Sequence, residues 1–312
     1  MSARPAILVT AADLAPQALA LLADFDVIYA GKTPDEDTVV ALCEKHQPVA
    51  IIVRYGKIPA RVMDASKSLR VISKHGAGID TIDSAAAAAR GIAVKAAAGA
   101  NADAVAEHAW ALILACAKGV VTLDARMRAG FWDKATHKSL DLRGKTLGVV
   151  GVGAIGRRVA VIGIAFGMDV LAFDPFAKVA PEGASLVGLD VLLARSHVVS
   201  LNCPLTEGNR HMINRTSIAT MRDGAIIANT GRGGLIDEPA LLEALAGGKL
   251  RAAGLDAFAT EPLVGEHHFR DVPNVVLSPH VGGVSEDAYV NMGTAAARNV
   301  LEVLSQSRPV AA

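Results

Sequence analysis

One turn in the sequence has glycines that could hold a phosphate group. The apolar segment Leu147–Val150 leads directly into the hexapeptide GVGAIG (151–156), and a helical pattern follows. In this strand–turn–helix setting GxGxxG is typical of dinucleotide binding. Gly151 permits the tight turn, Gly153 lets the backbone approach a diphosphate, and Gly156 lets helix and strand pack closely. The free N–H groups and the positive end of the helix favour the diphosphate.

A second strand-like segment ends at Asp174, where such folds place an acidic residue for the adenosine ribose. A carboxylate there accepts hydrogen bonds from ribose hydroxyls and repels a 2′-phosphate. Pro175 and Phe176 follow and supply no positive charge. The sequence therefore predicts NAD rather than NADP; the alternative is that Asp174 simply ends a strand.

Three later segments put reactive side chains at the ends of apolar strands. They are ANTGRGG (228–234), LDAFATEP (255–262) and SPHVGG (278–283). In an open parallel α/β sheet, ligands bind outside the carboxyl ends of the strands. All three segments are therefore expected at the ligand-binding edge.

The elements that must position these segments alternate between strands and helices. Strands are expected at 6–10, 27–30, 49–54, 71–74 and 92–95, and again at 146–150, 169–173, 198–201, 225–229, 252–256 and 275–277. This alternation predicts βαβ units and parallel sheets. We also expect one long connecting helix over 101–127, a loop over 128–145, and a last helix that begins at Ser285.

The predicted fold class is α/β, with two Rossmann-like parallel-sheet domains and a cleft between them. A flavodoxin-like substrate-binding domain comprises residues 1–99 and 285–312, and an inserted NAD-binding Rossmann domain comprises residues 100–284. The chain has 312 residues, 52% hydrophobic and 20% charged, which excludes disorder for most of it. Lys+Arg and Asp+Glu both number 31, so a broad nucleic-acid or anionic-membrane surface is not expected.

The three cysteines lie far apart without a CxxC pair. They predict neither a zinc site nor a disulfide framework, and they suit a cytoplasmic protein with reduced thiols. No His, Cys, Asp or Glu cluster has metal-ligand spacing, so no metal is expected. Glu107-His108 is interpreted as a helix-packing pair and His267-His268 as a solvated loop pair.

The motifs GVGAIG, FDP, NTGRGG, LDAFATEP and SPHVGG occur in that order. With them, nearly the whole chain resembles the D-isomer-specific 2-hydroxyacid dehydrogenases, closest to the phosphoglycerate dehydrogenase branch. The resemblance implies an NAD-dependent oxidoreductase with a catalytic set of Arg232, Glu261 and His280. The chain ends at Ala312, without the regulatory small-molecule domain of longer members. Feedback regulation by serine through such a domain is therefore not expected.

These roles agree with the chemistry of interconverting a hydroxy acid and an oxo acid. An imidazolium at His280 can donate a proton to the substrate oxygen and take it back in oxidation, since an imidazole ordinarily titrates near pH ~6.5. A carboxylate at Glu261 would orient the ring. Arg232 can hold the substrate carboxylate and polarise the carbonyl. Taken singly, each residue could equally be a turn, cap or loop residue.

The resemblance also implies the contacts with NAD: the glycine turn at the diphosphate, the 203–206 loop on the adenosine side, and residues near 230, 256 and 282 around the nicotinamide. The predicted cofactor set is Gly151, Gly153, Ala154, Ile155, Gly156, Asp174, Cys203, Pro204, Thr206, Thr230, Gly231, Asp256, Gly282 and Gly283.

The substrate end of the resemblance lies in the first domain. HGAGID (75–80) resembles the family's glycine loop, whose N–H groups can form a small anion nest. Arg54 and Lys74 could neutralise a phosphate, or they could be ordinary surface charges. The predicted substrate set is Arg54, Lys74, His75, Gly76, Ala77 and Asn101. The run 128–143 departs from the phosphoglycerate branch, which leaves the identity of the substrate's tail open.

The reaction expected on these grounds interconverts D-3-phosphoglycerate and 3-phosphohydroxypyruvate, a step of serine biosynthesis. The alternatives are reduction of glyoxylate or hydroxypyruvate, and a non-catalytic NAD-sensing protein like the corepressors that share this fold. The partner expected is a small 2-hydroxy or 2-oxo acid, with no nucleic acid or membrane. The resemblance further implies a homodimer, in which Trp132 is interpreted as reaching a neighbouring subunit.

Overall fold

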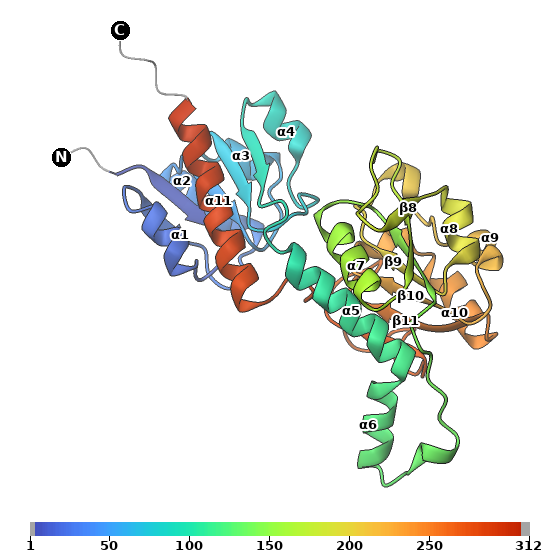
Figure 1. The fold of residues 1–312 in the computed structure, drawn as a ribbon. Helices are drawn as coiled ribbons and strands as arrows, with labels where there is room; N and C mark the ends of the chain where they lie inside the picture. Colours follow the sequence, from blue (N-terminus) through green and yellow to red (C-terminus); the bar gives the residue numbers. More distant parts are fainter. Residues whose placement is uncertain (1–3, 307–312) are drawn as a thin grey trace. The chain divides into compact units, whose positions relative to one another are not determined.

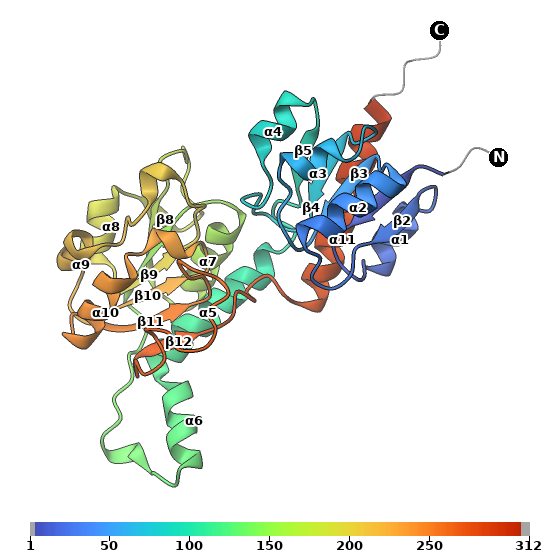
Figure 2. The ribbon, with the colours of Figure 1, turned by 180° about the vertical axis from the view of Figure 1, so that it is seen from behind.

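The computed structural model describes residues 4–306, which form two units (Figures 1 and 2). Among the described residues, unit 1 comprises residues 4–101 and 284–306, and unit 2 comprises Ala102–Gly283.

Unit 1 is built on a five-stranded parallel sheet. Its strands are β1 (Ala6–Val9), β2 (Asp26–Tyr29), β3 (Ala50–Val53), β4 (Val71–Lys74) and β5 (Ala93–Ala96), in the order β2-β1-β3-β4-β5. This is the expected flavodoxin-like order. Every residue of β3 is buried, as a central parallel strand with both faces covered requires.

Five helices of unit 1 cover this sheet: α1 (Pro16–Leu21), α2 (Glu36–His46), α3 (Ala60–Asp64), α4 (Ser84–Ala89) and α11 (Glu286–Gln306). The helix α11, red in Figure 1, packs Ala296, Ala297 and Val300 into the cluster that contains Ile7 and Val9 of β1. The last helix of the chain thus completes the core of the unit that the N-terminal residues begin.

Unit 2 is built on a seven-stranded parallel sheet. Its strands are β6 (Thr146–Val150), β7 (Asp169–Phe173), β8 (Ala184–Leu186), β9 (Val198–Leu201), β10 (Ala225–Asn229), β11 (Leu250–Leu255) and β12 (Val275–Leu277), in the order β12-β11-β10-β9-β6-β7-β8. From β8 to β11 this is the dinucleotide-binding order 3-2-1-4-5-6, and β12 adds a seventh strand. The order reverses between β6 and β9, so ligands are expected beyond the carboxyl ends of those two strands.

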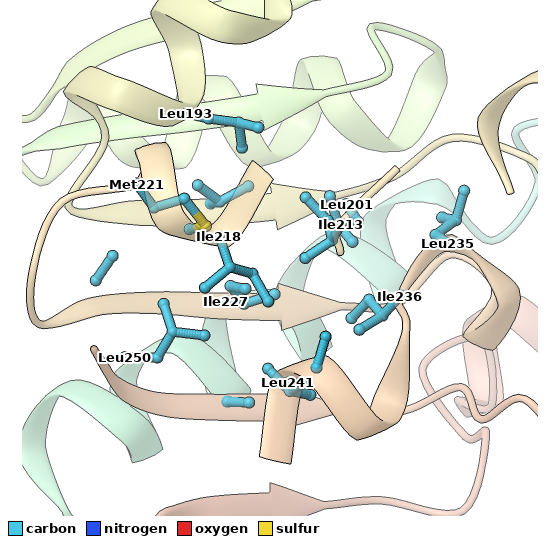
Figure 3. Close-up of a cluster of buried hydrophobic side chains, with 14 of the residues drawn as sticks. Leu193, Leu201, Ile213, Ile218, Met221, Ile227, Leu235, Ile236, Leu241 and Leu250 are labelled. Carbon is cyan, nitrogen blue, oxygen red and sulfur yellow. The ribbon is translucent and has the colours of Figure 1, made fainter. Parts of the chain in front are cut away.

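The helices that cover this sheet are α5 (Ala102–Lys118), α7 (Ala154–Ala165), α8 (Leu189–Arg195), α9 (Arg215–Thr220) and α10 (Glu238–Ala246). Figure 3 shows one of the two clusters that fill the core of unit 2. Leu235 and Ile236 lie in that cluster beside Leu241 and are almost fully buried. Because they follow Arg232 so closely, the core fixes the loop that carries this arginine.

The expected continuous helix over 101–127 is wrong. The chain breaks at Gly119, whose φ of +67° is left-handed, and α6 (Val120–Arg128) continues at 62° to α5. Figure 1 shows α6 leading away from the sheet of unit 2, and none of its residues is buried. Within residues 4–306 no single helix is long and apolar enough to cross a membrane; α5 and α6 satisfy that criterion only when the bent pair is taken together.

Candidate active site

The glycine turn joins β6 to α7 and requires glycine for two different reasons. Gly151 has a φ of +88°, which lies in the left-handed region. A Cβ at Gly156 would lie 1.9 Å from the carbonyl oxygen of Gly151, so no larger residue fits there. Gly153 is exposed with open space beside it. The turn therefore presents open backbone at the start of a 12-residue helix, which is a suitable site for a diphosphate.

Asp174 lies directly after β7 and hydrogen-bonds to the backbone of the glycine turn. Its Oδ2 accepts a hydrogen bond from the Val152 N–H at 2.9 Å, and its Oδ1 accepts one from the Phe176 N–H at 2.9 Å. Each carboxylate oxygen can accept more than one hydrogen bond. The partly buried side chain thus organises the turn and can still accept hydroxyl groups of a sugar.

The loop after β9 packs against two glycine-containing loops. A Cβ at Gly151 or at Gly231 would lie 2.9 Å from atoms of Cys203. Burial raises the pKa of the Cys203 thiol to about 11, so the thiol is neutral at physiological pH. The Asn209 amide oxygen accepts from the Thr206 N–H at 2.7 Å and orders the rest of the loop.

The hydroxyl of Thr230 is buried and has no hydrogen-bond partner within residues 4–306. Buried polar atoms rarely lack a partner, so this hydroxyl fits a polar group of a bound ligand. The open glycine turn and the available Asp174 oxygens fit a dinucleotide in the same way. The other predicted cofactor residues lie on the same edge: Ala154 and Ile155 begin α7, Pro204 follows Cys203, and Asp256, Gly282 and Gly283 follow β11 and β12.

Arg232 lies between β10 and the short turn η3 (Gly233–Leu235). Nη1 of Arg232 donates to the carbonyl oxygen of Gly231 at 2.9 Å. The carbonyl oxygen of Arg232 in turn accepts from the side-chain amide of Asn229 at 3.0 Å. A Cβ at Gly233 would lie 1.8 Å from the carbonyl carbon of Phe258. Glycine at this position therefore lets the Arg232 loop contact the loop that leads to Glu261.

Glu261 and His280 form a hydrogen-bonded pair. The Oε2 of Glu261 lies 2.7 Å from Nδ1 of His280, and Oε1 accepts from the Phe258 N–H at 2.9 Å. An ionised carboxylate only accepts hydrogen bonds, so Nδ1 carries a proton and donates it. The His280 side chain is 45% exposed, which leaves Nε2 available to exchange a proton with a ligand.

The backbone of His280 is held in an unusual conformation. Its φ is +55°, a left-handed value that is uncommon for a residue with a side chain. Asp256, only 2% exposed, accepts hydrogen bonds from the N–H groups of Val281 and Gly282 at 2.9 and 2.8 Å. The buried carboxylate thus fixes the segment that directs the His280 ring.

Two residues of this arrangement were absent from the predicted site. The Ser278 hydroxyl donates to Asp256 Oδ1 at 2.6 Å and lies 2.8 Å from His108 Nε2. Since the only Ser278 proton points to Asp256, Nε2 of His108 must be the donor of the second bond. His108 thus does more than the helix packing expected of it, because its ring hydrogen-bonds to Ser278. Its position on the inner face of α5 is the only sign of this role in the sequence, and the face could have been assigned from the apolar period.

A second buried carboxylate supports the Glu261 loop. Glu238, 9% exposed, accepts from the Ala259 N–H at 2.8 Å and pairs with His268 Nε2 at 2.9 Å. The expectation of a solvated His267-His268 pair holds in part: His268 is exposed but contacts Glu238, whereas Nδ1 of His267 is buried.

In unit 1, Arg54 directly follows strand β3, and Lys74 is the last residue of strand β4. Arg54 forms an ion pair through Nη1 with Asp13 and also donates to the carbonyl oxygen of Asp13 at 3.0 Å. Its guanidinium lies 4.9 Å from the ring centre of Tyr289, whose hydroxyl donates to Asp13 at 2.9 Å. Nζ of Lys74 donates to the carbonyl oxygen of Arg54 at 3.1 Å. Arg54 is therefore a largely buried, paired charge, and not the ordinary surface charge that was the alternative to a phosphate-binding role.

The remaining predicted substrate residues are His75, Gly76 and Ala77, which follow Lys74, and Asn101, which ends the first segment of unit 1. His75 is buried, and burial together with the charges of Arg54 and Lys74 lowers its pKa to about 4. Its Nε2 has no hydrogen-bond partner within residues 4–306. Gly76 has a φ of +144°, Ala77 is exposed, and Oδ1 of Asn101 is buried without a partner in the same range. No group of three metal-ligating side chains occurs in residues 4–306.

The chain resembles known proteins over almost its entire length. A family model described as "D-isomer specific 2-hydroxyacid dehydrogenase, NAD binding domain" matches residues 110–282. A hydroxypyruvate reductase of Thermotoga maritima is 42% identical over 247 residues, which cover 78% of this chain and 81% of that protein. A D-3-phosphoglycerate dehydrogenase of Mycobacterium tuberculosis is 38% identical over 300 residues, which cover 95% of this chain but 56% of that one.

Among solved structures, a glyoxylate reductase from Paecilomyes thermophila has a TM-score of 0.88 and 32% identity, covering 99% of this chain and 97% of that one. The chain thus spans about half the length of the phosphoglycerate dehydrogenase and nearly all of the glyoxylate reductase. Together with the dinucleotide-binding strand order, these matches identify it: the chain belongs to the D-isomer specific 2-hydroxyacid dehydrogenase family and carries that family's NAD-binding domain.

Proposed function

We propose that this protein catalyses the reversible reduction of a small 2-oxo acid to the D-2-hydroxy acid with NADH. The observation that supports this most is the 2.7 Å hydrogen bond between Glu261 and His280. It uses Nδ1 and leaves Nε2 as the nitrogen that exchanges a proton with the substrate. An enzyme that interconverts a carbonyl and an alcohol needs such a proton donor and acceptor.

Each residue of the proposed site has one task. In reduction, Nε2–H of His280 protonates the oxygen on C2 of the substrate; in oxidation, Nε2 takes the proton back. Glu261 keeps the ring oriented and stabilises the positive charge of the imidazolium. Arg232 binds the substrate carboxylate with its planar fork. The nicotinamide, when bound, supplies or accepts the hydride.

Two classes of substrate tail fit the relatives of this chain. Arg54 and Lys74 lie next to each other, which supports the phosphorylated tail of 3-phosphohydroxypyruvate. The similarity to a hydroxypyruvate reductase and a glyoxylate reductase supports a tail without phosphate. In both cases we propose that Arg54, Lys74, His75, Gly76, Ala77 and Asn101 contribute to substrate binding.

The test is oxidation of NADH with glyoxylate, pyruvate, hydroxypyruvate and phosphohydroxypyruvate, by the wild type and by His280→Asn. We expect turnover with at least one acid. We expect His280→Asn to lower kcat by about 10²- to 10⁴-fold, the usual contribution of a positioned proton donor. NADH binding, followed by fluorescence, should be retained. NADH binding without turnover of any of the acids would support the nucleotide-sensing alternative instead.

We also propose a cytoplasmic homodimer. Five apolar side chains of α6 and the turn after it are more than half exposed: Val120, Val121, Met127, Phe131 and Trp132. Such a concentration on one segment is typical of a surface covered by another chain. The three free cysteines suit a reducing compartment. Light scattering should give a dimer mass for the wild type and a monomer mass for a Val121→Asp/Trp132→Ser variant. Val161→Ser, at an equally exposed valine of α7, is the control and should stay dimeric.

A further inference from the structure

The loop between β1 and α1 places a carboxylate directly beside Arg54. Oδ1 of Asp13 pairs with Nη1 of Arg54 and accepts from the Tyr289 hydroxyl at 2.9 Å. The Arg54 side chain is only 15% exposed, whereas that of Asp13 is 66% exposed. A ligand that approaches this arginine therefore meets the Asp13 carboxylate at the same surface.

The two charges neutralise one another. The hydrogen bonds of Tyr289 and Arg54 lower the pKa of Asp13, so its carboxyl group is ionised at neutral pH. The side-chain hydrogen bonds of Arg54 within residues 4–306 all use Nη1, and the Tyr289 ring lies over the guanidinium. The other guanidinium nitrogens can still donate to a substrate oxygen, while Oδ2 of Asp13 can still accept from a substrate hydroxyl.

This combination distinguishes between substrate tails. A hydroxymethyl tail both donates and accepts hydrogen bonds, so it can bind Asp13 and Arg54 together. A phosphate at neutral pH only accepts and carries about two negative charges, so it is repelled by Asp13 and must displace it to use Arg54 fully. Selection against the wrong tail by an adjacent like charge is an established route to specificity.

We propose that Asp13 is the specificity-determining residue of this enzyme and selects an uncharged, hydroxyl-bearing tail, as in hydroxypyruvate, against a phosphorylated tail. This inference rests on the proposed reduction of a 2-oxo acid, in which Arg54 meets the tail of the substrate. It reverses the preference for the phosphorylated substrate that the sequence alone suggested. The sequence analysis did not pair Arg54 with Asp13, because the two residues lie 41 positions apart along the chain.

The experiment compares kcat/KM for hydroxypyruvate and phosphohydroxypyruvate in the wild type, Asp13→Asn and Asp24→Asn. We expect the wild type to prefer hydroxypyruvate. Asp13→Asn keeps the size of the side chain and removes its charge, and it should raise the relative kcat/KM for phosphohydroxypyruvate by about tenfold or more, since one removed repulsion of ~1.4 kcal/mol is a factor of ten. Asp24→Asn makes the same change in net charge at an exposed position of unit 1 and should leave the ratio unchanged.

Further arms separate the possible failures. The gain of Asp13→Asn should disappear in Asp13→Asn/Arg54→Gln, because the phosphate then has no freed guanidinium to bind. A wild type that prefers phosphohydroxypyruvate would overturn the inference, and so would equal ratios in Asp13→Asn and Asp24→Asn. A wild type that binds NADH but reduces none of the 2-oxo acids would overturn the proposed function itself. Circular dichroism of each variant establishes that it is folded.

Discussion

His280 in unit 2 and His75 in unit 1 both follow a strand of a parallel sheet, yet their surroundings are opposite. His280 is 45% exposed and its Nδ1 donates to a carboxylate. His75 is buried beside Arg54 and Lys74, and its pKa is lowered to about 4. The first ring has one nitrogen fixed and the other available, as proton transfer requires. The second is kept neutral, so it can line a site without contributing charge. The neighbours of a histidine, rather than its place at the end of a strand, decide its role.

The largest effect that tests this comparison concerns stability in acid. An unfolded chain protonates His75 near pH ~6.5, while the folded protein does so only near pH 4, so between these values the unfolded state binds the extra proton. The contribution is nil above pH ~6.5, and acidification to pH 4 should cost at most about 3 kcal/mol of folding free energy. The free energy of unfolding in urea, measured on the full chain between pH 7 and pH 4.5, should therefore depend less on pH in His75→Asn than in the wild type. Parallel curves for the two proteins would show that His75 titrates normally.

The next effect concerns the partner of His280. Glu261→Gln keeps an oxygen that accepts from Nδ1 but removes the negative charge that stabilises the imidazolium. We expect kcat for reduction to fall by about a hundredfold, within the range attributed to positioned acid–base groups. Glu266→Gln, at an exposed carboxylate of the same loop, is the control. A kcat equal to that of the wild type would mean that Glu261 only shapes the loop.

A Ser278 variant tests whether anchoring the backbone near His280 matters as much for kcat as the carboxylate of Glu261 does. Ser278→Ala leaves the buried Asp256 without one donor and His108 without its acceptor. We expect kcat to fall by about tenfold, because loss of one hydrogen bond to a charged group costs ~1.5 kcal/mol or more. The Kd for NADH should change less. Ser278→Thr retains the hydroxyl and should recover most of the activity; failure of this rescue would point to packing instead.

Much of this arrangement could be predicted from local patterns. The strands 146–150, 198–201 and 225–229 have the bounds expected, because buried parallel strands are continuous apolar runs between turn residues. The short α3 and β8 were missed, since five and three residues carry too little periodicity. The break at Gly119 was missed because a single glycine within a helical pattern is often tolerated.

The site divides in the same way. The glycine turn is local, so its sequence sufficed to predict its form. The bond between Ser278 and His108 joins residues 170 positions apart, and that between Tyr289 and Asp13 joins residues 276 apart. No spacing in a single sequence reports such pairs, because they depend on how helices α5 and α11 pack within their own units. The partners of His108 and of Arg54 therefore emerged only from the fold, whereas Glu261 was already expected as the partner of His280.

The smallest effect we expect returns to unit 1. Tyr289→Phe removes the hydroxyl that donates to Asp13 but keeps the ring beside the Arg54 guanidinium. Without that hydrogen bond Asp13 is held less firmly against Arg54, so discrimination against phosphohydroxypyruvate should weaken by about threefold, in the direction of Asp13→Asn, as loss of a hydrogen bond worth ~0.7 kcal/mol predicts. Tyr29→Phe removes a nearby hydroxyl that makes no hydrogen bond to Asp13 in the described part of the chain, and it should leave the kcat/KM ratio unchanged. Equal ratios in both variants would mean that the Arg54 pair alone fixes Asp13, and that α11 contributes to the fold of unit 1 but not to its selectivity.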